Sequence, residues 1–133
     1  LVEVLEEHFP EVVSTQPEFS AAHIDPMRDG TFDLAMEHGH AVLAYSPLAG
    51  GRIGSGQVEL ELVTVLDELA AREGVDRTTI AIAFVLAAPS SPVALLGTQQ
   101  PDRLQQAQRA LTVHLDRIDC YRIVEASEGV ALP

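Results

Sequence analysis

The sequence predicts an α/β fold in which short parallel strands alternate with helices. Three short apolar segments have the composition of strands, and longer segments with helical spacing of their apolar residues separate them. Alternation of this kind is typical of parallel strands joined by right-handed crossovers through helices. Three strands are too few for a complete doubly wound sheet or for an eight-stranded barrel. We therefore expect an incomplete parallel sheet within one domain of 133 residues.

Composition and charge narrow the class of protein. Apolar residues make up 47% of the chain and charged residues 21%, which indicates a globular domain. The net charge of −12 argues against partners with a phosphate backbone and against an anionic membrane surface. We therefore expect neither a nucleic-acid partner nor a membrane. The single cysteine, Cys120, has no internal partner, which fits a reducing cytoplasmic location.

The first third of the chain is expected to hold two helices and two strands. Helical spacing is present from Leu1 onward, so residues 1–9 predict a helix that Pro10 stops, and the chain is expected to be a piece of a longer protein. A strand then begins at 11–14 and continues toward Glu18, and 21–30 form a loop with one possible helical turn. Thr31 to His38 predicts a helix with Phe32, Ala35 and Met36 as its apolar positions and Gly39 as its C-cap.

The segment from His40 to Gly56 is the most informative. Residues 41–45 (AVLAY) are almost entirely apolar, as in a strand covered on both faces, and a glycine-rich loop is expected at 50–57. Helices are predicted after it at 58–73, at 77–88 behind a cap at Asp76, at 101–111 with Pro101 in its first position, and at 117–127 behind a cap at Asp116. The third strand is predicted at 93–96.

Polar residues follow each predicted strand, where sites lie in parallel α/β folds. Gln16 offers an amide, Tyr45 a ring for stacking, and 97–100 precede a helix N-terminus that favours an anion within reach of Arg103. Together these groups indicate a binding site for a nucleotide. These features also have simpler interpretations. The glycine-rich loop can be an ordinary turn, Tyr45 can be a packing residue, and Arg103 can form an ion pair with a surface carboxylate. No spacing fixes a metal site around His38 and His40, so no metal is expected.

Three motifs resemble those of the aldo/keto reductase family. AYSPLAGG is similar to the segment of its seventh strand, LLGTQQPDRLQQAQRAL to its eighth strand and following helix, and STQPEFS to its sixth strand. Their order and spacing agree across almost the whole chain. The resemblance implies that residues 1–133 are a partial aldo/keto reductase domain: the C-terminal half, strands 6–8, of a (β/α)8 barrel.

The resemblance also implies a cofactor and an activity, namely the NADPH-dependent reduction of aldehydes or ketones. By matching position, Gln16 would hold the nicotinamide carboxamide and Tyr45 would stack on the nicotinamide ring. Backbone would line the pyrophosphate, and later residues would meet the adenosine end. The remaining cofactor-binding residues that it implies are Ser46, Leu48, Gly50, Gly97, Thr98, Gln99, Arg103 and Gln106.

Departures from the family pattern limit the expected activity. Thr15 replaces an asparagine, and Gln106 and Ala107 replace a Glu-Asn pair. The chain has no lysine, whereas the family's catalytic set of Asp, Tyr, Lys and His lies in the other half of the barrel, so no catalytic residue is assigned here. We expect the chain alone to be inactive unless an N-terminal half completes it and admits a carbonyl substrate. The alternatives are an inactive nucleotide-binding or scaffold module that self-associates through open barrel edges, and an unrelated α/β binding domain.

Overall fold

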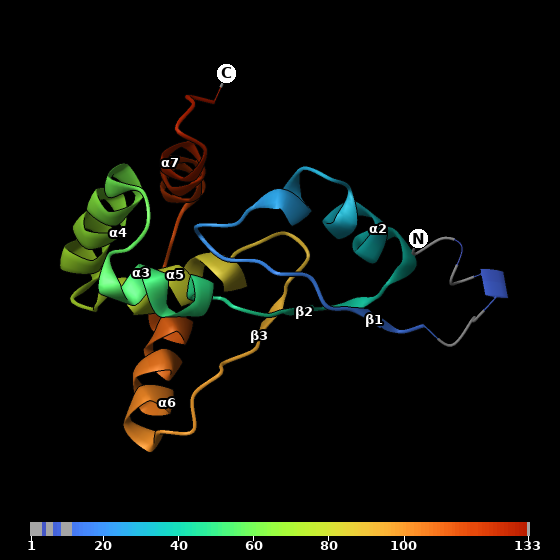
Figure 1. Cartoon of the computed structure of the whole chain (residues 1–133), viewed down its shortest axis with the longest axis horizontal. Coiled ribbons are helices and arrows are strands. Elements are labelled where there is room, and N and C mark those ends of the chain that lie inside the picture. The colour runs from blue at the N-terminus through green and yellow to red at the C-terminus, as the bar shows by residue number, and fades with distance from the viewer. Residues whose placement is uncertain (1–3, 5–6, 9–11, 133) are drawn as a thin grey trace.

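The computed structural model describes residues 4, 7–8 and 12–132, and it contains a parallel sheet of three strands. The strands are β1 (Ser14–Thr15), β2 (Ala41–Ala44) and β3 (Val93–Ala94), in the order β1-β2-β3 (Figure 1). Ser14 pairs with Ala41, and Leu43 pairs with Val93. The predicted parallel pairing is confirmed. The helix expected over residues 1–9 lies largely outside the described residues.

Two segments connect β1 to β2 and follow the expected pattern. A 3-10 turn, η1 (Asp25–Met27), leads to helix α2 (Thr31–His38), which ends at Gly39 with a φ of 69°. Glycine adopts this left-handed conformation without the steric cost that a Cβ imposes. Met36 differs from the expectation because it is 47% exposed, so the buried stripe of α2 is narrower than the sequence indicated.

The glycine-rich segment after β2 is mostly helical, and the expected open loop is therefore wrong. It forms a 3-10 turn, η2 (Ala49–Gly51), and a short helix, α3 (Arg52–Ser55). Gly50, Gly51 and Gly56 have φ values of 65°, 90° and 73°, which let the chain reverse between these turns. The Nε atom of Arg52 donates to the Ala49 carbonyl oxygen at 3.0 Å and ties the two turns together.

The rest of the described chain consists of helices and β3, joined by short turns and irregular segments. Asp76 accepts a hydrogen bond from the Thr79 amide at 2.9 Å, and Asp116 forms a capping box with Asp119, so both predicted caps are confirmed. The elements are α4 (Leu60–Glu73), α5 (Arg77–Leu86), α6 (Pro101–Gln108), the 3-10 turn η3 (Arg109–Thr112) and α7 (Arg117–Glu128).

The hydrophobic core lies between the sheet and helices α2, α4, α5 and α7. The Phe19 ring packs edge-on against Phe32 with ring centroids 4.8 Å apart and lies 5.7 Å from the Phe84 ring. Helix α5 is buried from Thr79 to Val85, as its nearly uniform apolar sequence predicted. This helix is the central support of the fold because α3, α4, α6 and β3 all pack against it.

One face of the sheet is open. Val42 and Ala44 are buried, whereas Ala41 is exposed and Tyr45 is 41% exposed. Val93, which pairs with Leu43 on this open face, is 53% exposed. The expectation that this strand is covered on both faces is therefore wrong. Alternate residues of a strand point to opposite faces, and the helices of the described chain cover only the face of Val42 and Ala44.

Candidate functional site

The ends of the first two strands are joined as the sequence predicted. Beyond β1, Glu18 forms a parallel bridge with Tyr45. The Tyr45 amide donates to the Pro17 carbonyl oxygen at 3.0 Å, and the Phe19 amide donates to the Tyr45 carbonyl oxygen at 3.2 Å. Gln16, which is exposed, lies between the paired Thr15 and the bridged Glu18. The amide of Gln16 and the ring of Tyr45 thus project from neighbouring strand ends.

The Tyr45 side chain lies at the rim of the open face. It shares the face of Ala41 because residues 41, 43 and 45 alternate with the buried Val42 and Ala44. Its hydroxyl donates to Glu18 Oε2 at 3.5 Å, the long limit for a hydrogen bond. A ring that is 41% exposed at a strand end has area free for stacking on a planar ligand.

The turn that follows Tyr45 presents backbone at the same edge of the sheet. Ser46 has a φ of 51°, and the Ala49 amide donates to the Ser46 carbonyl oxygen at 2.8 Å. Leu48 is half-buried and anchors the turn in the core. Gly50 is exposed, and a Cβ built there would meet no atom within 4 Å. The turn therefore leaves room for a ligand to approach the backbone at Gly50.

The end of the third strand leads into the N-terminus of α6. Gly97 and Gln99 are exposed, and the Thr98 hydroxyl accepts a hydrogen bond from the Gln100 amide at 3.2 Å. No side chain caps α6. Arg103 in its first turn is exposed and makes no hydrogen bond or ion pair with any described residue. The simpler interpretation of Arg103, a surface ion pair, is not seen among these residues.

Gln106 has a partner that the sequence did not predict. Its amide nitrogen donates to Asp76 Oδ2, and Asp76 also caps α5. Burial raises the pKa of the Asp76 carboxyl, but hydrogen bonds from Thr78, Thr79 and Gln106 outweigh it, so the pKa is lowered. The carboxylate is therefore charged at neutral pH. Because these two residues are 30 positions apart, no local pattern indicates the contact.

A second arginine fixes the segment after β2 against the helices. The guanidinium of Arg77 donates to both carboxylate oxygens of Asp67, at 2.8 and 2.6 Å, and to the Ile53 carbonyl oxygen at 3.2 Å. The hydrogen bond from Arg77 lowers the pKa of Asp67. Helices α3, α4 and α5 are thereby held together below the turn at Ser46 to Gly50.

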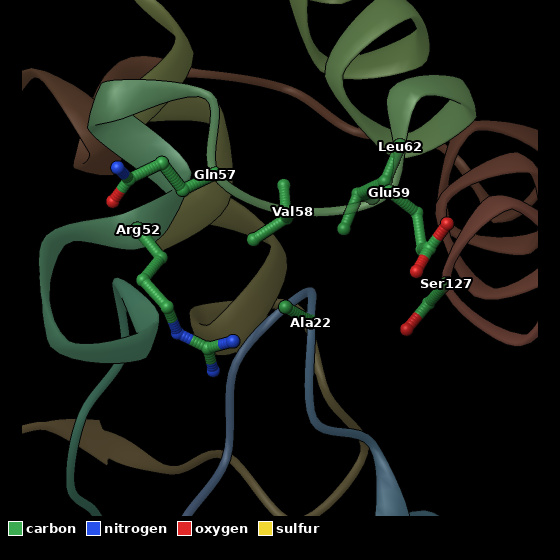
Figure 2. Close-up of a pocket in the computed structure, with 7 residues that line it drawn as sticks. All are labelled: Ala22, Arg52, Gln57, Val58, Glu59, Leu62 and Ser127. Carbon is green, nitrogen blue, oxygen red and sulfur yellow. The ribbon is translucent and has the colours of Figure 1, made fainter.

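A cavity of about 350 Å³ lies between the α3–α4 connection and the end of α7. Figure 2 shows Arg52 on one side of it and Glu59 with Ser127 on the other. The lining residues are Ala22, Arg52, Gln57, Val58, Glu59, Leu62 and Ser127. None of the site residues predicted from the sequence lines this cavity. The predicted residues instead follow the three strands, and two of them, Arg103 and Gln106, lie on α6.

The described part of the chain has neither a cluster of metal-ligating side chains nor a membrane-spanning helix. No group of three or more histidine, cysteine or acidic side chains there is arranged to hold a metal ion. Within residues 4, 7–8 and 12–132, no helix has the length and apolar character needed to cross a bilayer. Cys120 is half-buried on α7, and burial raises the pKa of its thiol.

Comparison with known proteins identifies the family. The model of the aldo/keto reductase family matches residues 1–128. A 6-dehydroglucose reductase of Novosphingobium aromaticivorans is 37% identical over 124 residues, which cover 92% of this chain and 41% of that protein. Oxidoreductase YdhF of Escherichia coli is 30% identical, with 98% of this chain and 44% of that protein covered.

The fold comparison agrees with the sequence comparison. The crystal structure of a thermostable aldo-keto reductase, Tm1743, in complex with the inhibitor epalrestat superposes with a TM-score of 0.81 at 23% identity. The match covers 95% of this chain and 44% of that one, so the chain spans less than half the length of these proteins. Its three parallel strands and their helices correspond to part of a (β/α)8 barrel. The chain belongs to the aldo/keto reductase family.

Proposed function

We propose that this chain is the C-terminal half, strands 6–8, of the barrel of an NADPH-dependent reductase of aldehydes or ketones, and that it supplies the cofactor site. The observation that carries the proposal is the exposed Tyr45 ring at the rim of the open sheet face, beside the exposed Gln16. Arg103, without a partner among the described residues, supports it at the third strand end. Gln16 and Tyr45 follow the ends of β1 and β2, and Arg103 lies in the first turn of α6, the helix that follows β3.

The described residues fit an extended dinucleotide. Tyr45 would lie against the nicotinamide ring and Gln16 would hold its carboxamide. The pyrophosphate would approach the backbone of Ser46, Leu48 and Gly50, where the space beside Gly50 is open. The phosphates of the adenosine end would meet the backbone at 97–99 and the guanidinium of Arg103. When bound, NADPH supplies a hydride, and this chain's residues bind and orient the cofactor.

The chain alone is expected to bind cofactor without reducing a carbonyl. It contains no lysine, and its only tyrosine besides Tyr45 is Tyr121, which is 50% exposed on α7. The second candidate function, an inactive nucleotide-binding or scaffold module, shares the same cofactor site. Family membership sets aside the unrelated binding domain. The two remaining functions differ in whether a segment with the acidic, tyrosine, lysine and histidine groups completes the barrel.

Titration of NADPH with the protein, followed by cofactor fluorescence, tests the cofactor site. We expect a blue shift of the emission because the nicotinamide ring leaves water for the surface of Tyr45. Tyr45→Ala should abolish the shift. Tyr121→Ala is the matched control because it removes the chain's other tyrosine, on a helix away from the strand ends, and should leave the shift intact. Absence of a shift with the unsubstituted protein at high concentration would overturn the proposal.

Self-association through the open face is the partner expectation that follows. The face exposes Val93, and within the described chain the outer edges of β1 and β3 pair with no further strand. Unpaired edges and an exposed apolar face favour association with a second copy. Sedimentation should show an oligomer that Val93→Asp weakens and Leu111→Asp, on a residue 76% exposed in η3, does not. A monomer at every concentration would contradict this expectation.

A further inference from the structure

Helix α6 is held to the rest of the fold by contacts that are unusually polar. None of its side chains is buried, and its one leucine, Leu104, is 40% exposed. Ala107 is only half-buried against a small apolar cluster formed by Ile82 and Ala83 of α5 and Ala110 of η3. Figure 1 shows α6 projecting from the body of the molecule on the side opposite α7. Apolar burial therefore contributes little to fixing the position of this helix.

Two side chains tie α6 and the adjoining turn to a single point, the connection between α4 and α5. The Gln106 amide nitrogen donates to Asp76 Oδ2. The guanidinium of Arg109, one turn further along at the start of η3, donates to the Gly74 carbonyl oxygen at 2.7 Å. Gly74 ends α4 and Asp76 caps α5, so both acceptors belong to one short connection.

The acceptors are themselves fixed by the fold. Besides Gln106, Asp76 accepts from the Thr79 amide at 2.9 Å and from the Thr79 hydroxyl at 3.0 Å. Gly74 has a φ of 66° and its turn is closed by a hydrogen bond from its amide to the Ala70 carbonyl oxygen. A hydrogen bond to a carboxylate held by several donors has a defined direction, so the Gln106 contact sets the position of α6 as well as its stability.

We propose that Gln106 and Arg109 are positioning residues that dock α6 onto the α4–α5 connection and thereby set the place of Arg103. Arg103, Gln106 and Arg109 follow one another at intervals of three residues, so docking at Gln106 and Arg109 constrains the helix turn that carries Arg103. The docking follows from the contacts alone. Its consequence for ligand binding rests on the proposed cofactor site. Gln106 thus acts by holding the helix, since its amide is already engaged with Asp76.

Hydrogen–deuterium exchange of the full chain, without ligand, tests the docking. Amides from Leu104 to Gln108 should exchange about tenfold faster in Gln106→Ala, the effect of losing one hydrogen bond to a charged group. Arg109→Ala should accelerate the same amides. Gln105→Ala is the matched control because it removes the same side chain from the same helix at an exposed residue that makes no hydrogen bond with another described side chain, and it should leave exchange unchanged. Equal exchange in Gln106→Ala and Gln105→Ala would overturn the inference.

Exchanging the donor and the acceptor of the Gln106–Asp76 hydrogen bond distinguishes loss of this contact from a general loss of helix stability. Gln106→Glu alone places a second carboxylate beside Asp76 and should accelerate exchange. Asp76→Asn retains an N-cap residue of equal quality for α5 and supplies an amide donor. The pair Asp76→Asn with Gln106→Glu should therefore restore protection of α6. If the pair exchanges as fast as Gln106→Glu alone, the two side chains do not act together and the inference fails.

Binding of adenosine 2′,5′-bisphosphate, measured by calorimetry, tests the consequence for Arg103. We expect Gln106→Ala to raise the Kd about tenfold and Gln105→Ala to leave it unchanged. A Kd that is equal in the two variants, when their α6 exchange differs, would overturn the positioning role of Gln106. If the unsubstituted protein does not bind the nucleotide while Gln106→Ala still accelerates exchange, the docking stands and the proposed cofactor site fails.

Discussion

Asp119 offers the sharpest test of how the helices are held together. It is 5% exposed and is the only buried carboxylate of the described chain. Arg72 at the end of α4 donates to both of its oxygens, at 2.8 and 2.7 Å, and the Asp116 amide donates to it at 3.1 Å. One side chain thus joins α4 to α7 and completes the capping box. Asp119→Asn keeps its shape and removes its charge.

The expected cost follows from these contacts. A hydrogen bond to a charged group contributes about 1.5–3 kcal/mol, and the lower end applies because the Arg72 side chain is 47% exposed. The amide of asparagine still accepts one hydrogen bond, so we expect a loss of about 2 kcal/mol in the free energy of unfolding. Urea unfolding, with a slope of about 2 kcal/mol per molar, should then show a midpoint lower by about 1 M.

The same two helices provide the control. Arg122 and Glu68 also join α7 to α4, at 2.5 Å, but their side chains are 40% and 58% exposed. Exposed pairs contribute about 0.2–1 kcal/mol, so Glu68→Gln should move the midpoint by less than half as much. Equal shifts in the two variants at neutral pH would refute the argument that burial, and not the ion pair itself, determines the strength of the contact.

The pH dependence gives an independent check on Asp119. Hydrogen bonds from Arg72 lower the pKa of this carboxyl below its usual value of 3.8. A group with a depressed folded pKa contributes stability that is fully present above its unfolded pKa and is lost as the pH falls through its folded pKa. The difference between the unsubstituted protein and Asp119→Asn should therefore be constant near neutral pH and should shrink below pH 3.8.

A glycine substitution and the alkylation of Cys120 test other parts of the fold. Gly56→Ala should lower the free energy of unfolding by about 1–2 kcal/mol in a thermal or urea melt, because Gly56 has a φ of 73° and a Cβ there would lie 3.3 Å from Arg77 Nη1. Gly97→Ala should change the free energy of unfolding much less, because Gly97 has no positive φ and a Cβ there would enter open space. Cys120 should react slowly with iodoacetamide at pH 7.5, because burial raises the pKa of its thiol and the carboxylates of Asp119 and Asp116 raise it further. Alkylation as fast as in the urea-unfolded chain would contradict this.

Local chemistry explains what the sequence could predict about the fold. The bounds of α2 at Thr31 and His38, with Gly39 after it, follow from residues within one helical turn of each end. Asp76 and Asp116 likewise identify the starts of α5 and α7 through hydrogen bonds to amides three residues away. The parallel pairing of the strands follows from the alternation of elements, and so does the meeting of the first two strand ends, where Glu18 forms a bridge with Tyr45.

What the sequence could not predict depends on distant residues. The apolar segment 41–45 is compatible with a strand covered on both faces, and only the arrangement of the helices shows that one face is open. The glycines at 50, 51 and 56 permit either an open loop or tight helical turns. The structure has the helical turns, and Arg52 and Arg77 donate hydrogen bonds to their backbone carbonyl oxygens. The resemblance implied a cofactor-binding role for Gln106, which stays a prediction, but it gave no sign of the hydrogen bond that Gln106 donates to Asp76.

The arginines provide an electrostatic argument for where an anion would bind. The chain has a net charge of −12 and eight arginines. Four of them form ion pairs with carboxylates, namely Arg28, Arg72, Arg77 and Arg122. Two others, Arg52 and Arg109, donate to backbone carbonyl oxygens. Arg103 and Arg117 make neither contact with the described residues, and each lies in the first turn of a helix.

The two helix ends differ in what already occupies them. The amides at the start of α7 face the carboxylates of the Asp116 and Asp119 capping box, which would repel an incoming phosphate. The first turn of α6 carries one carboxylate, Asp102, but no side chain caps the helix, so its free amides are not occupied by a carboxylate as those of α7 are. An anion near Arg103 would therefore interact favourably with the uncapped N-terminus of α6. It would also interact with a guanidinium that has no ion-pair partner among the described residues. Arg103→Gln should consequently weaken nucleotide phosphate binding much more than Arg117→Gln, although the two substitutions change the net charge equally.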